Sequence, residues 1–216
     1  MRTAFLAGLL AACLGPARAS PPDRDACAPA VAAAEHGART APGLLGAIAV
    51  VESGRRDPRT GARRPWPWTV NAEGAGTYYP TKAAAIAAVQ ALQARGVQSA
   101  DVGCMQVNLL HHPAAFRSLD EAFDPGANAR YAARFLTSLF ARTGAWPAAA
   151  AAYHSFTPER GTQYAKLIAA VWAGAPVPVA PGPAGAEVVS FPDGGQLRIF
   201  RDAAAPGRVL GYLSGP

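Results

Sequence analysis

A glutamate directly follows a nearly unbroken apolar run, at a position where a charge is costly. Residues 44–51 read LLGAIAVV, and Glu52 comes next, ahead of a serine, a glycine and two arginines. On a helix, Leu45, Ile48 and Glu52 lie at i, i+3 and i+7, so the carboxyl shares a face with two large apolar side chains. Burial and the negative end of the helix dipole both raise a carboxyl pKa. The sequence therefore predicts at Glu52 a carboxyl that holds its proton near neutral pH, as a general acid must.

The elements that must position this carboxyl are mostly helical. Helical periodicity and capping residues, such as Thr81 before one helix and Gly144 after another, predict a mainly α bundle of about six helices. A small β-hairpin insertion is expected where WTVN and TYY flank the turn AEGAG. Between the helices we expect a turn-rich connector over 99–108 and a short helical piece, broken by Pro113, over 109–116. The expected helices cover residues 23–37, 42–53, 82–95, 124–143, 147–154 and 158–172.

Three short motifs occur in a fixed order along these elements. They are ESG at 52–54, GCMQVN at 103–108 and AAYHS at 151–155. Together they resemble the soluble lytic transglycosylase (SLT) domain family, which has a goose-lysozyme-like fold, over roughly residues 25–172. The chain departs from the family pattern at His154, where asparagine is usual, at Cys104, where an aliphatic residue is usual, and in the insertion RRPWPWTVN.

The resemblance implies a reaction that needs one carboxyl and no cofactor. Glu52 would protonate the oxygen between N-acetylmuramic acid and N-acetylglucosamine in peptidoglycan glycan strands. As a carboxylate it would then take the proton of the carbon-6 hydroxyl of the same muramic sugar, which closes a 1,6-anhydro ring. One carboxyl suffices because the nucleophile is already attached to the substrate.

The remaining candidate site residues come from the three motifs and from the insertion RRPWPWTVN. Tyr153 is expected to orient Glu52, while Ser53 either bonds the carboxyl or ends the helix. Side chains that would bind the glycan are Ser53, Met105, Gln106, Asn71, Trp68 and His154. The rings of Trp66 and Trp68 either stack on sugars or form a small core for the hairpin, and both alternatives stay open.

Two other function classes compete with this one. A lysozyme-like hydrolase would need a second carboxylate about 5–9.5 Å from the first, and the candidates are Asp57, Glu73 and Asp101. A non-catalytic wall-binding scaffold would need Glu52 to be exposed or disarmed. Metal chemistry is not expected, because the pair His111–His112 has no partner at ligand spacing and HExxH is absent; these histidines are expected at the surface.

The first residues predict export to the periplasm or beyond the cell. Arg2, an apolar stretch over 4–14 and ARA at 17–19 form a signal peptide over 1–19; lipid attachment at Cys13 is the lesser alternative. Cleavage removes two basic residues and lowers the formal net charge from +6 to +4, which suits an anionic wall polymer. We expect a monomer and no nucleic-acid partner, and leave open an envelope secretion or flagellar assembly.

Two cysteines and a tail complete the expected organisation. In an oxidising compartment Cys27 and Cys104 form a candidate disulfide, the alternative being two buried thiols. The catalytic domain is expected over 20–172, followed by a Pro/Ala/Gly linker over 173–186. The segment 187–216 is expected to be a short β-rich or disordered tail.

Overall fold

The computed structural model describes residues 25–57, 60–174, 187–190, 196–201 and 209–214. The expected signal peptide, Cys13 and most of the expected linker lie outside these residues. The helices are α1 (Cys27–Ala38), α2 (Leu44–Ser53), α3 (Lys82–Ala94), α4 (Leu119–Ala122), α5 (Pro125–Thr143), α6 (Trp146–His154) and α7 (Pro158–Trp172). The strands are β1 (Gly54–Arg56), β2 (Arg63–Pro65), β3 (Thr69–Ala72), β4 (Ala75–Tyr78), β5 (Ala100–Val102), β6 (Val107–Asn108), β7 (Glu187–Ser190), β8 (Gln196–Arg201) and β9 (Val209–Ser214).

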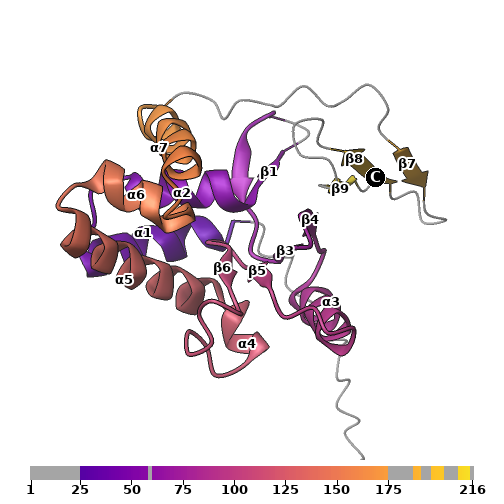
Figure 1. Cartoon of the computed structure of the whole chain (residues 1–216). Coiled ribbons are helices and arrows are strands. Elements are labelled where there is room, and N and C mark those ends of the chain that lie inside the picture. The colour runs from indigo at the N-terminus through magenta and orange to yellow at the C-terminus, as the bar shows by residue number, and fades with distance from the viewer. Residues whose placement is uncertain (1–24, 58–59, 175–186, 191–195, 202–208, 215–216) are drawn as a thin grey trace, which may run out of the picture.

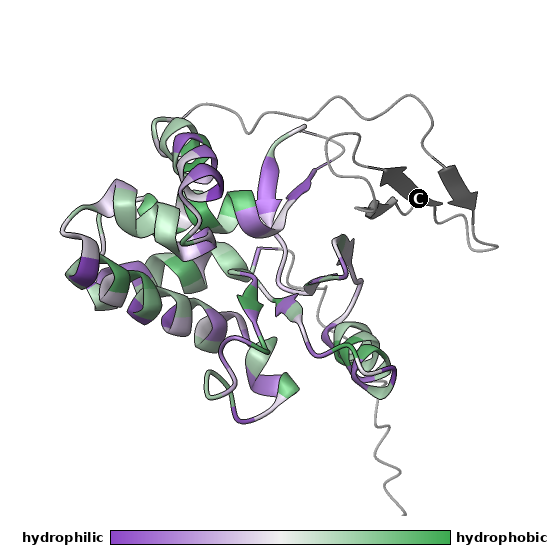
Figure 2. Cartoon of the chain, viewed as in Figure 1, coloured by the Kyte–Doolittle hydropathy of each residue, from purple (hydrophilic) through white to green (hydrophobic). Residues whose placement is uncertain are grey.

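Five helices build one core, which we call the helical side. Helices α1, α2, α5, α6 and α7 gather together in Figure 1, and their inward residues form a single buried cluster. In α2, Leu44, Leu45 and Ile48 are at most 1% exposed, as expected of a helix that is apolar all round. Figure 2 shows that this hydrophobic helix is followed by the hydrophilic ribbon of β1 and β2.

A smaller core lies on the other side of the molecule, which we call the sheet side. Strands β4-β3-β5-β6 form an antiparallel sheet, and the residues buried between this sheet, α3 and α4 form a second cluster. The expected hairpin is present as β3 and β4. The segment 99–108 is wrongly predicted as a connector, because β5 and β6 pair with each other and β5 pairs with β3.

The caps of the long helices follow the sequence prediction. The side chains of Thr81 and Asp124 accept hydrogen bonds from the backbone N–H groups of Ala84 and Ala127, at the starts of α3 and α5. The helical piece expected over 109–116 is absent, and that segment consists of turns. Asn108 explains the difference, because its Oδ1 accepts the N–H groups of Leu110 and His111 and turns the chain there.

The C-terminal strands match the expected β tail. Strands β7, β8 and β9 form a three-stranded antiparallel sheet in that order. The fold is therefore mainly helical and lysozyme-like, with a small β insertion. None of the described helices is both long and apolar enough to cross a membrane.

Candidate active site

Helix α2 places Glu52 at its last turn, and α7 packs along α2 and contacts the carboxyl. At one end of the pair, Trp172 Nε1 donates to the carbonyl of Pro42, 2.8 Å away. At the other end, Tyr164 Oη donates to Glu52 Oε1 over 2.5 Å. The two helices therefore run antiparallel, because the last residue of α7 lies beside the start of α2 and Tyr164, about two turns earlier, lies beside the end of α2.

The surroundings of Glu52 hold its proton. The side chain is half-buried, and burial is the main reason why its pKa rises from 4.5 to about 7. The bond from Tyr164 favours the charged form and lowers the pKa, while the negative charge of Asp101 raises it. The carboxyl is therefore close to half-protonated at neutral pH, which suits a group that first gives a proton and then takes one.

The motif that follows Glu52 ties α2 to the turn between β5 and β6. Ser53 Oγ donates to the carbonyl of Cys104 over 2.7 Å, so its hydroxyl joins two elements and does not bond the carboxyl. A Cβ at Gly54 would collide with the carbonyl of Val50, so only glycine lets the chain leave α2 in this direction. The expected disulfide between Cys27 and Cys104 is present and links α1 to the same turn, with 5.7 Å between the Cα atoms.

The turn itself is packed around Asn128 of α5, which is fully buried. Its Oδ1 accepts the N–H of Met105, and its Nδ2 donates to the carbonyls of Val102 and Ala122. Gly103 has a φ of +81°, and a Cβ there would lie 2.5 Å from Asn128 Nδ2. Glycine is therefore required at this position by both backbone conformation and space.

Met105 and Gln106 occupy this turn in different ways. The side chain of Met105 is 0% exposed and packs in the core of the helical side. Gln106 has a φ of +47°, and its Nε2 donates to the carbonyls of Thr69 and Gly103. Through these two hydrogen bonds Gln106 connects the turn to β3, and they fix the orientation of its amide.

Two tyrosines lie near Glu52, and only Tyr153 belongs to the three sequence motifs. Tyr153 Oη donates to the carbonyl of Met105 over 2.9 Å, so this phenol holds the turn rather than the carboxyl. Tyr164, which lies outside the three motifs and was not predicted, makes the bond to Glu52. The sequence feature that could have identified Tyr164 is its position between Gly161 and Ile168 on the buried face of the predicted helix. His154 stacks on Tyr164 with 4.6 Å between ring centroids.

The aromatic residues of the insertion mostly build the sheet side. Trp66 is 6% exposed and its Nε1 donates to the carbonyl of Tyr79. Trp68 is half-buried, meets Trp66 edge to face and packs against the core of the sheet side. Asn71 lies on β3 between the buried Val70 and Ala72, and so points to the opposite face of the sheet.

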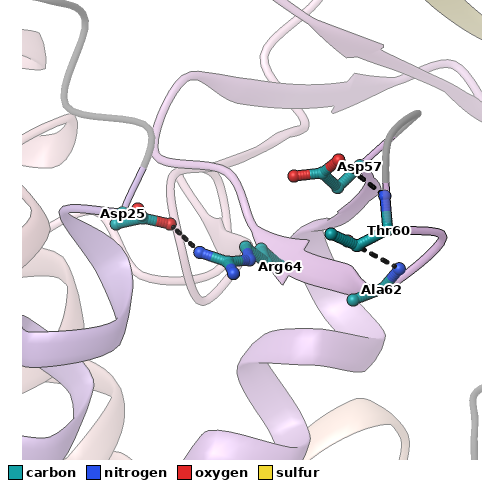
Figure 3. Close-up of polar contacts among 5 residues, drawn as sticks. All are labelled: Asp25, Asp57, Thr60, Ala62 and Arg64. Atoms are coloured by element: carbon teal, nitrogen blue, oxygen red, sulfur yellow. Dashed lines mark hydrogen bonds and ion pairs between the residues drawn. The ribbon is translucent and has the colours of Figure 1, made fainter.

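The three candidate second carboxylates differ in their partners and in their effect on Glu52. Asp57 Oδ1 accepts the N–H of Thr60 in the β1–β2 hairpin, where Arg64 also pairs with Asp25 over 2.7 Å (Figure 3). Glu73 pairs with Arg95 on an exposed edge. Asp101 acts on Glu52 through its charge, and it is half-buried on β5.

Of the two histidines expected at the surface, His111 is exposed as predicted and His112 is not. His112 is half-buried rather than at the surface, because its ring packs edge to face on Phe135 and its Nδ1 lies 2.9 Å from Tyr131 Oη. Burial lowers its pKa. Among the described residues, no group of three or more His, Cys, Asp or Glu side chains is placed to hold a metal ion.

Comparison with known proteins agrees with the fold. The mainly helical architecture with small antiparallel sheets is that of a lysozyme-like domain. The family model of the transglycosylase SLT domain matches residues 29–163, more than half of the chain, and the chain belongs to this family. The family indicates peptidoglycan as the substrate and lytic transglycosylase-type cleavage in general. Neither the curated proteins nor the solved structures contain a match.

Proposed function

We propose that this protein is an exported lytic transglycosylase that cleaves the bond from N-acetylmuramic acid to N-acetylglucosamine. The observation that carries the proposal is the carboxyl of Glu52, half-buried, bonded to Tyr164 and with a pKa of about 7. An acid with this pKa can give its proton to the leaving oxygen and remain stable as a carboxylate afterwards.

The reaction uses the substrate's own nucleophile. Glu52 protonates the bridging oxygen as the bond to carbon 1 breaks. The resulting carboxylate then accepts the proton of the carbon-6 hydroxyl, whose oxygen bonds to carbon 1 and forms 1,6-anhydromuramic acid. Tyr164 keeps the carboxyl in one orientation throughout, and this orientation allows one group to serve both steps.

Other residues of the site support substrate binding and positioning. Asn71, Trp68 and Gln106 lie on or beside the sheet, and we propose that they bind the sugars around the scissile bond. His154 would contribute through its stacking on Tyr164. Ser53, Met105 and Tyr153 would act by fixing the turn that faces Glu52, through the bonds of Ser53 and Tyr153 to its carbonyls.

Replacing Glu52 with Gln tests the proposal, because amide and carboxyl have the same shape. Purified sacculi should be solubilised by the wild-type protein, with 1,6-anhydro ends detected by mass spectrometry. We expect Glu52→Gln to lose at least about 1,000-fold of this activity while still binding sacculi. Unchanged cleavage by the variant would overturn the assignment, and reducing ends, one water heavier, would indicate a hydrolase.

Two controls separate catalysis from folding. Glu73→Gln removes an exposed carboxyl that pairs with Arg95, and it should leave activity unchanged. Glu52→Gln should unfold at the same or a higher temperature above pH 7. A carboxyl whose pKa is raised by folding stabilises the fold only at low pH, and this contribution is lost as pH rises through about 7.

Export forms a separate part of the proposal. We propose that residues 1–19 are removed and that the mature enzyme acts as a monomer in the periplasm or outside the cell. Intact mass of the protein recovered from the cell envelope tests this. A chain beginning at Ser20 supports cleavage after Ala19, whereas an acylated chain beginning at Cys13 supports the lipid anchor.

A further inference from the structure

Three polar side chains form a row across the sheet, opposite the face that packs on α3. Asn71 of β3 lies directly across from Asp101 of β5, and Asp101 lies directly across from Asn108 of β6. On β5 the neighbours of Asp101, Ala100 and Val102, are at most 2% exposed in the second core. Since side chains alternate along a strand, Asp101 points to the other face, together with Asn71 and Asn108.

Asn108 fixes the orientation and the charge of Asp101. Its Oδ1 accepts two backbone N–H groups, from Leu110 and His111, which can only donate. Its Nδ2 must therefore donate, and it does so to Asp101 Oδ1 over 2.8 Å and to Ser99 over 3.0 Å. A carboxylate that accepts such a bond is stabilised in its charged form.

The face of the sheet that carries the polar row meets the end of α2. Tyr78 of β4 lies directly across from Thr69, so it is on the same face as Asn71 and Asp101, and its Oη donates to the carbonyl of Gly54, two residues after Glu52. The charge of Asp101 raises the pKa of both Glu52 and Tyr153, so the carboxylate acts on groups of α2 and α6 at once. The groups facing Glu52 are Tyr164 of α7, Tyr153 of α6 and Asp101, and His111 faces Asp101 from the next loop. Near the start of β1, Arg63 and Tyr78 both donate to the carbonyl of Gly54.

We propose that Asp101 is a second catalytic residue, a permanent carboxylate that stabilises the positive charge developing at carbon 1 of the sugar. The inference rests on the proposed function and concerns the same bond cleavage. As the bond from carbon 1 to the leaving oxygen breaks, that oxygen takes its proton from Glu52. Asp101 neither gains nor loses a proton, and the carbon-6 hydroxyl still supplies the nucleophile.

The surroundings divide the two roles between the two carboxyls. Glu52 lies at the end of an apolar helix, where the neutral form is favoured, whereas Asp101 accepts an amide hydrogen bond in a polar row. Burial raises both pKa values. The bond from Tyr164 opposes the rise at Glu52, whereas the bond from Asn108 and the charge of His111 oppose it at Asp101. Asp57 and Glu73 are engaged in the hairpin turn and with Arg95, so neither competes for this role.

Asp101→Asn tests the inference, because it removes the charge and keeps the size. We expect kcat on purified sacculi to fall about 100-fold with KM within about threefold of wild type. The alkaline limb of the pH profile should also move to lower pH, since loss of a nearby negative charge lowers the pKa of Glu52. A residue that only supports the sheet would not move this limb.

Three comparisons make the result decisive. Asp101→Glu, which keeps the charge, should recover at least part of the lost kcat, and Glu73→Gln should change nothing. A kcat of Asp101→Asn within threefold of wild type overturns the inference while leaving Glu52 as the acid. The inference is also overturned if Asp101→Asn and Asp101→Glu lose kcat equally and circular dichroism shows that each loss equals the loss of folded protein. Failure of the proposed function can be distinguished from failure of this inference, because Glu52→Gln would remain active only if the proposed function is wrong.

Discussion

The two sides of this molecule surround their carboxyls with opposite chemistry. On the helical side, Glu52 ends a helix whose other residues are apolar or small, and one phenol is its hydrogen-bonding partner. On the sheet side, Asp101 lies in a row of amides and accepts a bond from Asn108. The apolar surroundings of Glu52 exclude water from the carboxyl, which favours its protonated form, whereas the amide of Asn108 donates to Asp101, which favours its charged form.

Both sides of the molecule contact one turn, residues 103–106, and this turn fixes their relative position. From the helical side, the Cys27 disulfide and the bonds of Ser53 and Tyr153 reach this turn. From the sheet side, β5 and β6 enter and leave the turn, and Asn128 of α5 fills it from the helical side. The relative position of the two carboxyls therefore depends on contacts that neither side makes alone, and these contacts can be removed one at a time.

The largest effect is expected from the disulfide that anchors α1 to the turn. Cys27 and Cys104 are 77 residues apart, and closing a loop of this length stabilises a fold by about 4 kcal/mol in the chain-entropy model. The double variant Cys27→Ser, Cys104→Ser should lose about this free energy of unfolding, measured by urea titration. Dithiothreitol should lower the wild-type midpoint and leave the variant unchanged; an equal midpoint in both proteins would contradict the prediction.

A smaller loss is expected from Asn128, which supports the turn from α5. Asn128→Ala leaves the N–H of Met105 and the carbonyls of Val102 and Ala122 buried without this partner. We expect a loss of about 3 kcal/mol in the free energy of unfolding, since each unpaired buried group costs about 1–3 kcal/mol and the site relaxes in part. Ser138→Ala on the exposed face of the same helix is the matched control and should cost less than about 0.5 kcal/mol.

The helical side was more predictable from sequence than the sheet side, for a physical reason. Helical periodicity is local, so the ends of α5 and the inward face of Glu52 follow from neighbouring residues. The strand pair β5 and β6 was missed because a three-residue and a two-residue strand carry no periodic signal, and their pairing with β3 links distant segments. The bond from Tyr164 to Glu52 spans 112 residues, so only the packing of α7 on α2 reveals it.

The smallest effect is expected from Tyr164, which decides how sharply the two carboxyls differ. Tyr164→Phe removes a bond that lowers the pKa of Glu52 but keeps the ring that excludes water. The alkaline limb of activity should therefore move to higher pH, opposite to its movement in Asp101→Asn, and kcat at neutral pH should fall about tenfold through lost orientation. Tyr153→Phe, whose hydroxyl bonds Met105, is the matched control and should leave the limb in place. The phenol of Tyr164 stabilises the carboxylate form of Glu52, whereas the charge of Asp101 destabilises it. Tyr164→Phe and Asp101→Asn should therefore move the alkaline limb in opposite directions, and a shift of both variants in the same direction would contradict this prediction.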